Sequence, residues 1–174
     1  MKRRKTDAKR IGEWVELRFL ARAAEAGLTI SKPYGDSAPF DFVVGRRAPL
    51  HRVQVRGTSV ELKGGYGVPV AHGSVRPRRY KPTDFDFLAA HVIPHNAWYI
   101  IPFKVIGRQR FLRFRPQDGT ASAGRAKAAR TGNAGDGGSR QSKSETEARR
   151  GALRWEVYRE AWHLLGGSGE LVKR

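Results

Sequence analysis

The first apolar pattern along the chain has the period of a helix. Between Ile11 and about Gly27, apolar residues recur every three or four positions, at Trp14, Leu17, Ala21 and Ala24. Gly27 can adopt the left-handed conformation that ends helices, so we predict a helix over this range. Residues 1–10 carry six Lys or Arg and one Asp, which predicts a basic flexible arm ahead of it.

Short apolar runs separated by turn residues follow the helix and predict strands. They read LTI, FDFVV, HRVQV, YGVPV and, further on, FLRF. DFLAAHVI and WYIIPF flank PHNA, an arrangement typical of a hairpin. A helix followed by such strands predicts an α/β domain over 11–116, with a mixed sheet and helices packed on it.

Residues 117–150 interrupt this pattern. They contain no Val, Ile, Leu, Met, Phe, Trp or Tyr, so nothing offsets the entropy of ordering them, and a disordered insertion is predicted. Order should resume in 151–166, where Tyr158, Ala161, Trp162 and Leu165 have helical spacing and predict a C-terminal helix packing on the core. Residues 167–174 would form a tail.

The net charge of the chain limits the kinds of partner that the protein can be expected to bind. Lys and Arg total 34 against 16 Asp and Glu, a formal charge of +18, and there is no cysteine. Such an excess points to a polyanionic partner, nucleic acid above all. A membrane surface would favour a basic amphipathic helix or a long apolar run, and neither is present. The expectation is a soluble, cytoplasmic protein without disulfides or a thiolate metal site.

Three segments carry residues suited to chemistry. In the predicted strand VQVRGTS, side chains two apart share a face, so Gln54 and Arg56 point away from the apolar side of the strand. Asp41 lies among apolar neighbours and needs a cation or donors. Glu16 lies on a helical row of small and apolar residues, and Gly12, one turn earlier, would let another backbone approach. These oxygen ligands suit Mg²⁺ or Mn²⁺.

The order GEWVE, PFDFVV, VQVRGTS resembles the PD-(D/E)XK nuclease superfamily. It is most similar to the branch found among group I intron homing endonucleases, in which glutamine replaces the second acid. The similarity covers roughly residues 11–116 and implies a restriction-endonuclease-like mixed sheet flanked by helices. It also implies that Glu16, Asp41 and Gln54 bind the metal.

Arg56 occupies the place of the family's lysine, which positions or activates the attacking water. A guanidinium keeps its charge at any working pH, so Arg56 can hold the scissile phosphate but cannot act as a general base. Lys63 is a candidate for a migrated lysine, although the adjacent Gly64-Gly65 favours a turn position. In the family two chains commonly join to cut both strands, which implies a homodimer or a larger homo-oligomer.

Clustered basic residues supply the expected contacts to the phosphates of double-stranded DNA. They are Lys2, Arg3, Arg4, Arg76, Arg78, Arg79 and Lys81. Three functions remain open. The favoured one is a Mg²⁺-dependent endonuclease acting on DNA. The alternatives are a catalytically impaired nucleic-acid-binding module on the same fold and a basic protein that assembles with another protein on RNA.

Two other groups of polar residues are weaker candidates for a functional site. Thr83 and Asp86, three residues apart, fit a local capping arrangement, so Asp84 and Asp86 are interpreted as structural. His91 and His95 are separated by a proline turn, and the remaining histidines are scattered, so no zinc site is expected.

Overall fold

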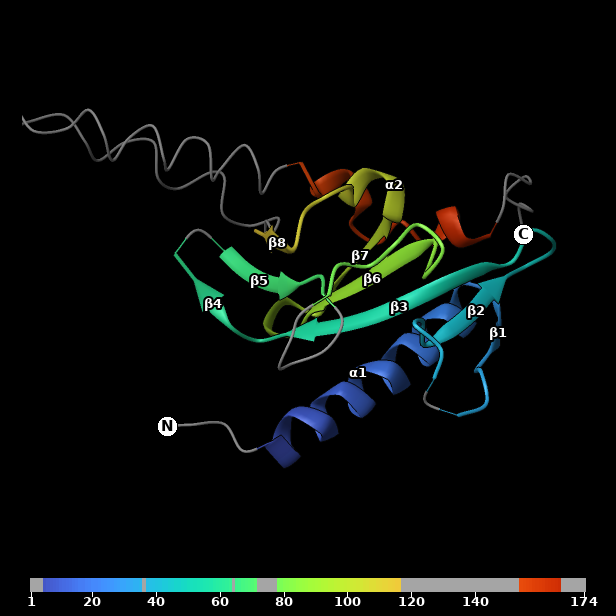
Figure 1. The fold of residues 1–174 in the computed structure, drawn as a ribbon, viewed down its shortest axis with the longest axis horizontal. Coiled ribbons are helices and arrows are strands. Elements are labelled where there is room, and N and C mark those ends of the chain that lie inside the picture. The colour runs from blue at the N-terminus through green and yellow to red at the C-terminus, as the bar shows by residue number, and fades with distance from the viewer. Residues whose placement is uncertain (1–4, 36, 64, 72–77, 117–153, 167–174) are drawn as a thin grey trace, which may run out of the picture.

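The computed structural model describes residues 5–35, 37–63, 65–71, 78–116 and 154–166 (Figure 1). Its strands are β1 (Thr29–Ser31), β2 (Phe42–Gly45), β3 (His51–Thr58), β4 (Glu61–Leu62), β5 (Gly65–Pro69), β6 (Phe87–Val92), β7 (Ala97–Pro102) and β8 (Phe111–Phe114). Its helices are α1 (Lys5–Glu25), α2 (Phe103–Ile106) and the 3₁₀ turns η1 (Ile93–His95), η2 (Glu156–Tyr158) and η3 (Trp162–Leu165). The predicted insertion 117–150 and the tail 167–174 lie outside the described residues.

Five strands form the main sheet in the order β1-β2-β3-β6-β7. The central β3–β6 pair is parallel and the other pairs are antiparallel, so the sheet is mixed. The predicted hairpin is confirmed: β6 and β7 pair antiparallel around η1. A smaller antiparallel sheet, β4-β5-β8, lies beside it. The α/β class with a mixed sheet is therefore confirmed.

Each face of the main sheet has its own core, because side chains alternate along β3. Val53 and Val55 pack with Phe19 of α1 in one apolar cluster. Leu88, which pairs with Gln54 across β3 and β6, belongs to a second cluster with residues of β5, α2 and β8. Figure 1 shows α1 along one side of the sheet and α2 with β8 on the other. Gln54 is thus turned away from α1, as the sequence predicts.

The first helix begins at Lys5, six residues before the predicted start. Residues 5–10 of the predicted arm are therefore helical, and residues 1–4 lie outside the described part. The sequence KTDAKR explains this: Lys, Arg and Ala favour helices, and Asp7 stands in the first turn, where an acid is favourable. None of the described helices is both long enough and apolar enough to cross a membrane.

Close packing of α1 on β3 occurs at Gly57. A Cβ built there would lie 2.5 Å from Cγ2 of Val15, so only glycine lets the helix approach so closely. The expectation that Gly12 has this role is wrong, because a Cβ at Gly12 meets no described atom within 4 Å. The glycine that lets α1, the helix of Glu16, pack closely is therefore Gly57 in β3.

The C-terminal segment is not the predicted helix. Two short 3₁₀ turns, η2 and η3, flank Glu160, whose φ of 49° breaks any helix. The amide of Glu160 donates to the Trp98 carbonyl at 2.8 Å, and Arg159 forms a β-bridge with Tyr99. The segment thus pairs with the edge strand β7 between the turns. The helical spacing gave a wrong prediction of one continuous helix, because apolar side chains before and after Glu160 both face the core.

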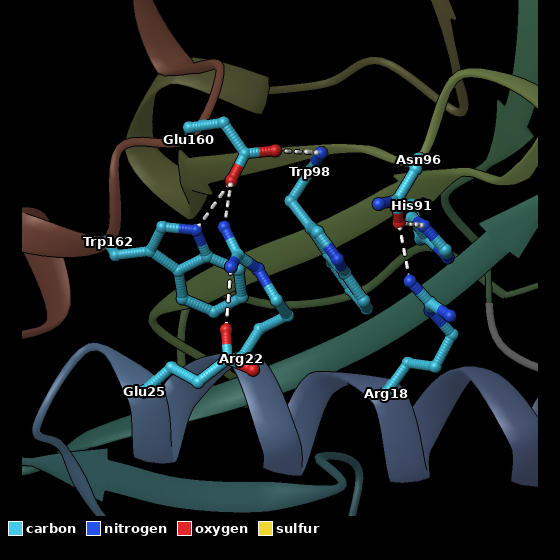
Figure 2. A network of polar contacts seen from close by, with 8 residues as sticks. All are labelled: Arg18, Arg22, Glu25, His91, Asn96, Trp98, Glu160 and Trp162. Atoms are coloured by element: carbon cyan, nitrogen blue, oxygen red, sulfur yellow. Dashed lines mark hydrogen bonds and ion pairs between the residues drawn. The ribbon is translucent and has the colours of Figure 1, made fainter.

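The Glu160 carboxylate fastens this segment to the sheet and to α1 (Figure 2). Oε1 accepts from the Trp98 amide at 2.9 Å, and Oε2 accepts from Nε1 of Trp162 at 2.8 Å and from Nη2 of Arg22 at 3.1 Å. Arg22 also donates to Glu25 at 2.6 Å. A few residues away, Arg18 donates to Asn96 at 2.6 Å and ties α1 to the β6–β7 hairpin. These contacts hold the C-terminal half of α1 against the C-terminal segment and the β6–β7 hairpin.

Replacing Gly57 with alanine should lower the free energy of unfolding by about 1–3 kcal/mol, because the added methyl group pushes Val15 and α1 away from β3. Gly12→Ala is the matched control. Its methyl group meets open space, and alanine is favoured over glycine in a helix by about 1 kcal/mol, so this variant should be more stable than the wild type. Urea denaturation measures both. A Gly57→Ala protein as stable as the wild type would contradict the close contact.

Candidate active site

Asp41 directly precedes β2 and is held by the backbone of β3. Its amide donates to the Val53 carbonyl at 2.9 Å, which continues the register in which Phe42 faces Val53. Oδ2 accepts from the Val55 amide at 2.7 Å and from Nε2 of Gln54 at 2.5 Å. The antiparallel pairing therefore places the acid of PFDFVV beside the amide of VQVRG.

Burial raises the pKa of Asp41, because desolvation penalises the charged carboxylate. The hydrogen bond from Val55 and the charges of Arg56 and Lys32 act in the opposite direction, whereas the charge of Glu16 raises the pKa further. These side chains thus lie close enough to Asp41 to act on its charge. Four predicted residues, Glu16, Asp41, Gln54 and Arg56, converge on one region from three elements.

Gln54 is 4% exposed and orients the Asp41 carboxylate. The atom turned towards Asp41 is Nε2, a donor, so a half-turn of the amide would be needed to present Oε1 to a cation there. Both side-chain hydrogen bonds of Asp41 end on Oδ2, and none of the described residues donates to Oδ1. A partly desolvated carboxylate with one oxygen left for a ligand fits a divalent cation.

Glu16 comes from the middle of α1, and its side chain is 27% exposed. Its Oε2 lies 2.9 Å from Nζ of Lys32, a residue that the sequence analysis missed. Lys32 follows β1 directly, and the pairing of Ser31 with Val43 carries it towards Phe42. The only signal in TISKPYG is a lysine directly after a short strand, and the sequence does not show that this strand pairs with β2.

Arg56 donates from Nη2 to the hydroxyl of Tyr80 at 2.7 Å. Arg52, four residues earlier on the same face, has a different partner: it forms an ion pair with Asp86, with Nη2 2.8 Å from Oδ1. This pair corrects the capping interpretation of Thr83 and Asp86, because the Asp86 carboxylate binds the side chain and the amide of Arg52. Asp84 instead accepts from the Lys81 amide.

A pocket of about 660 Å³ lies beside Tyr80, away from Asp41. Its walls combine aromatic rings with cationic side chains, among them Tyr80, Phe85, Phe103, Arg79 and Lys104. Tyr80 links this pocket to Arg56, whose guanidinium donates to the Tyr80 hydroxyl.

The predicted phosphate-binding residues divide into two groups. Arg78, Arg79 and Lys81 are exposed. Lys2, Arg3, Arg4 and Arg76 lie outside the described residues. Lys63, the candidate migrated lysine, follows β4 and is not among the charges that shift the pKa of Asp41.

One of the two weighed histidines, His91, is buried in the core of the sheet. His91 stacks on Trp98 at 4.3 Å between ring centroids, and burial lowers its pKa to about 4. Within the ranges that the structure describes, no group of three or more His, Cys, Asp or Glu side chains could share a metal ion. A cation at Asp41 would therefore rely on two carboxylates and an amide, a donor set for a hard ion.

The fold is that of the PD-(D/E)XK nuclease superfamily. A family profile described as PD-(D/E)XK endonuclease matches residues 6–130, and the chain belongs to this family. A search of curated proteins found no match. Among solved structures, the chain is similar to a bacterial homing endonuclease, I-Ssp6803I, at 25% identity over 88% of both chains and with a TM-score of 0.60. The resemblance to the homing-endonuclease branch is confirmed.

Asp41→Asn and Asp86→Asn should change stability in opposite directions. The raised pKa of Asp41 means that the folded protein loses stability as pH rises through that pKa, so removing the charge should increase the free energy of unfolding at pH 7. The hydrogen bond from Arg52 lowers the pKa of Asp86, so its charge stabilises the fold above the usual aspartate pKa, and Asp86→Asn should cost about 1 kcal/mol.

Urea denaturation of both variants at pH 7, repeated near pH 3, measures these differences. Both should shrink at the lower pH, where the wild-type carboxylates become protonated. If Asp41→Asn and Asp86→Asn lose equal stability at pH 7, the Asp41 carboxylate is not desolvated in the folded protein.

Proposed function

We propose that this protein is a metal-dependent endonuclease that hydrolyses phosphodiester bonds of double-stranded DNA. Membership of the PD-(D/E)XK endonuclease family supports nuclease chemistry. The observation that carries the proposal is the partly desolvated Asp41 carboxylate, oriented by Val55 and Gln54 and within electrostatic reach of Glu16 and Arg56. This combination of anionic ligands and a fixed cation suits phosphoryl transfer.

Asp41 and Glu16, with Gln54 as a third donor, would hold Mg²⁺ or Mn²⁺. Such an ion, when bound, lowers the pKa of a water ligand and polarises a phosphoryl oxygen. Arg56 has the separate task of binding the scissile phosphate through its permanent charge. The hydroxyl of Tyr80 restrains the guanidinium, which reduces the entropy lost when Arg56 engages the phosphate.

The formal charge of +18 supports a polyanionic substrate. Exposed Arg78, Arg79 and Lys81 would contact the sugar–phosphate backbone, and binding should weaken steeply as salt concentration rises. Cutting both strands of a duplex requires two sites, so a homodimer or a larger homo-oligomer is part of the proposal.

A second candidate function rests on Arg56. If the family's lysine must give up its proton, arginine cannot replace it, and the protein would bind nucleic acid without cleaving it. Both functions predict binding to DNA, so only cleavage separates them.

Supercoiled plasmid incubated with the protein and Mg²⁺ or Mn²⁺ should be nicked and linearised. Glu16→Gln and Asp41→Asn should each reduce the cleavage rate by about 10²-fold or more, because each removes a charged ligand from the site. Glu13→Gln is the matched control: Glu13 lies one turn before Glu16 on α1 and pairs with Lys9 at the surface. Its cleavage rate should equal that of the wild type.

Two results would contradict the endonuclease. Cleavage that survives Asp41→Asn would place the chemistry elsewhere, or in a contaminant. Absence of cleavage with either metal, together with cleavage by Arg56→Lys, would establish the binding module instead.

A further inference from the structure

Lys32 is a second cation near Asp41. Neither the proposed metal ligands nor the phosphate contact of Arg56 involves it. In the strand order β1-β2-β3, Asp41 precedes the middle strand, Lys32 follows one neighbour and Arg56 lies on the other. The two cations therefore flank Asp41 from opposite sides. The charges of both side chains also lower the pKa of Asp41, so both contribute positive potential at the carboxylate.

Contacts with Glu16 and Phe42 help to position Lys32. Its Nζ lies 2.9 Å from Oε2 of Glu16 and 5.6 Å from the centroid of the Phe42 ring, next to Asp41 in the chain. An ordinary surface ion pair contributes about 0–1 kcal/mol, and the Lys32 side chain is 63% exposed. The Lys32–Glu16 pair therefore contributes little to the stability of the fold. The location of Lys32, paired with Glu16 and next to the strand that follows Asp41, gives a functional reason for the pair.

The charges of the site show what Lys32 can do. Glu16 and Asp41 together carry two negative charges, which one divalent cation balances. An ammonium paired with Glu16 then competes with that cation for the charge of the Glu16 carboxylate. Negative charge accumulates on the phosphoryl oxygens during phosphodiester hydrolysis, and Arg56 alone supplies one positive charge.

We propose that Lys32 is a substrate-binding residue of this site. It pairs with Glu16 in the free protein and transfers its ammonium to a phosphate oxygen of the bound DNA, opposite Arg56. This role rests on the proposed endonuclease function and requires only the charge of Lys32, without proton transfer. The flexible four-carbon stem of lysine allows the change of partner, whereas Arg56 is restrained by Tyr80.

The proposal predicts two effects of opposite sign for Lys32→Met. Without the competing ammonium, the DNA-free protein should bind Mn²⁺ about threefold to tenfold more tightly, measured by isothermal titration calorimetry. The kcat for plasmid cleavage should fall about 10- to 100-fold, because one cation facing the phosphate is lost. Lys32→Arg, which keeps the charge, should retain a higher kcat than Lys32→Met.

Lys9→Met is the matched control, because Lys9 forms an ion pair with Glu13 on the same helix, outside the site. It should change neither Mn²⁺ affinity nor kcat. A fall in both quantities for Lys32→Met would indicate a merely structural role and overturn the proposal. An unchanged kcat, or Lys32→Arg no better than Lys32→Met, would overturn the phosphate contact.

The outcomes also separate this proposal from the endonuclease function. If the wild type cleaves and Lys32→Met behaves like the wild type in both assays, Lys32 is excluded while the nuclease stands. If the wild type does not cleave any DNA, the endonuclease function and the phosphate contact both fall. The Mn²⁺ titration then decides whether Lys32 competes for Glu16, and an unchanged affinity rejects that part too.

Discussion

The hydrogen bond from the Val55 amide to the Asp41 carboxylate is the contact on which the site depends. It joins the residue before β2 to the centre of β3 and continues the antiparallel register of the two strands. Because the donor is backbone, the position of the carboxylate follows from strand pairing and not from a flexible side chain. Gln54 adds a second donor to the same oxygen, so the other oxygen is available to a ligand.

This arrangement has an energetic cost that its surroundings reduce. Desolvation disfavours the charge of Asp41, and the backbone donor, Arg56 and Lys32 oppose that effect. A cation bound there would oppose it more strongly, so the same burial that destabilises the carboxylate favours metal binding. The remainder of the fold maintains the geometry: Gly57 lets α1 approach β3, and Glu160 holds the C-terminal segment on β7 and α1.

Much of this architecture could be predicted from sequence, because strand periodicity determines which side chains share a face. Val53 and Val55 pack under α1, whereas Gln54 points away from α1 and donates to the Asp41 carboxylate. The predictions failed where tertiary contacts decide the local structure. Pairing with β7 and the positive φ of Glu160 replace the expected C-terminal helix by two 3₁₀ turns. Lys32 escaped notice because its proximity to Glu16 arises from β1–β2 pairing, which the run LTI alone does not specify.

The central claim is that Asp41 and Glu16 share one divalent cation, and anomalous diffraction from crystals soaked in Mn²⁺ tests it most directly. A shared ion would give a single strong peak within about 2.5 Å of an Asp41 oxygen and a Glu16 oxygen, with Lys32 displaced from Glu16. Manganese peaks elsewhere, with Asp41 still bonded only to Val55 and Gln54 and Glu16 still paired with Lys32, would contradict it.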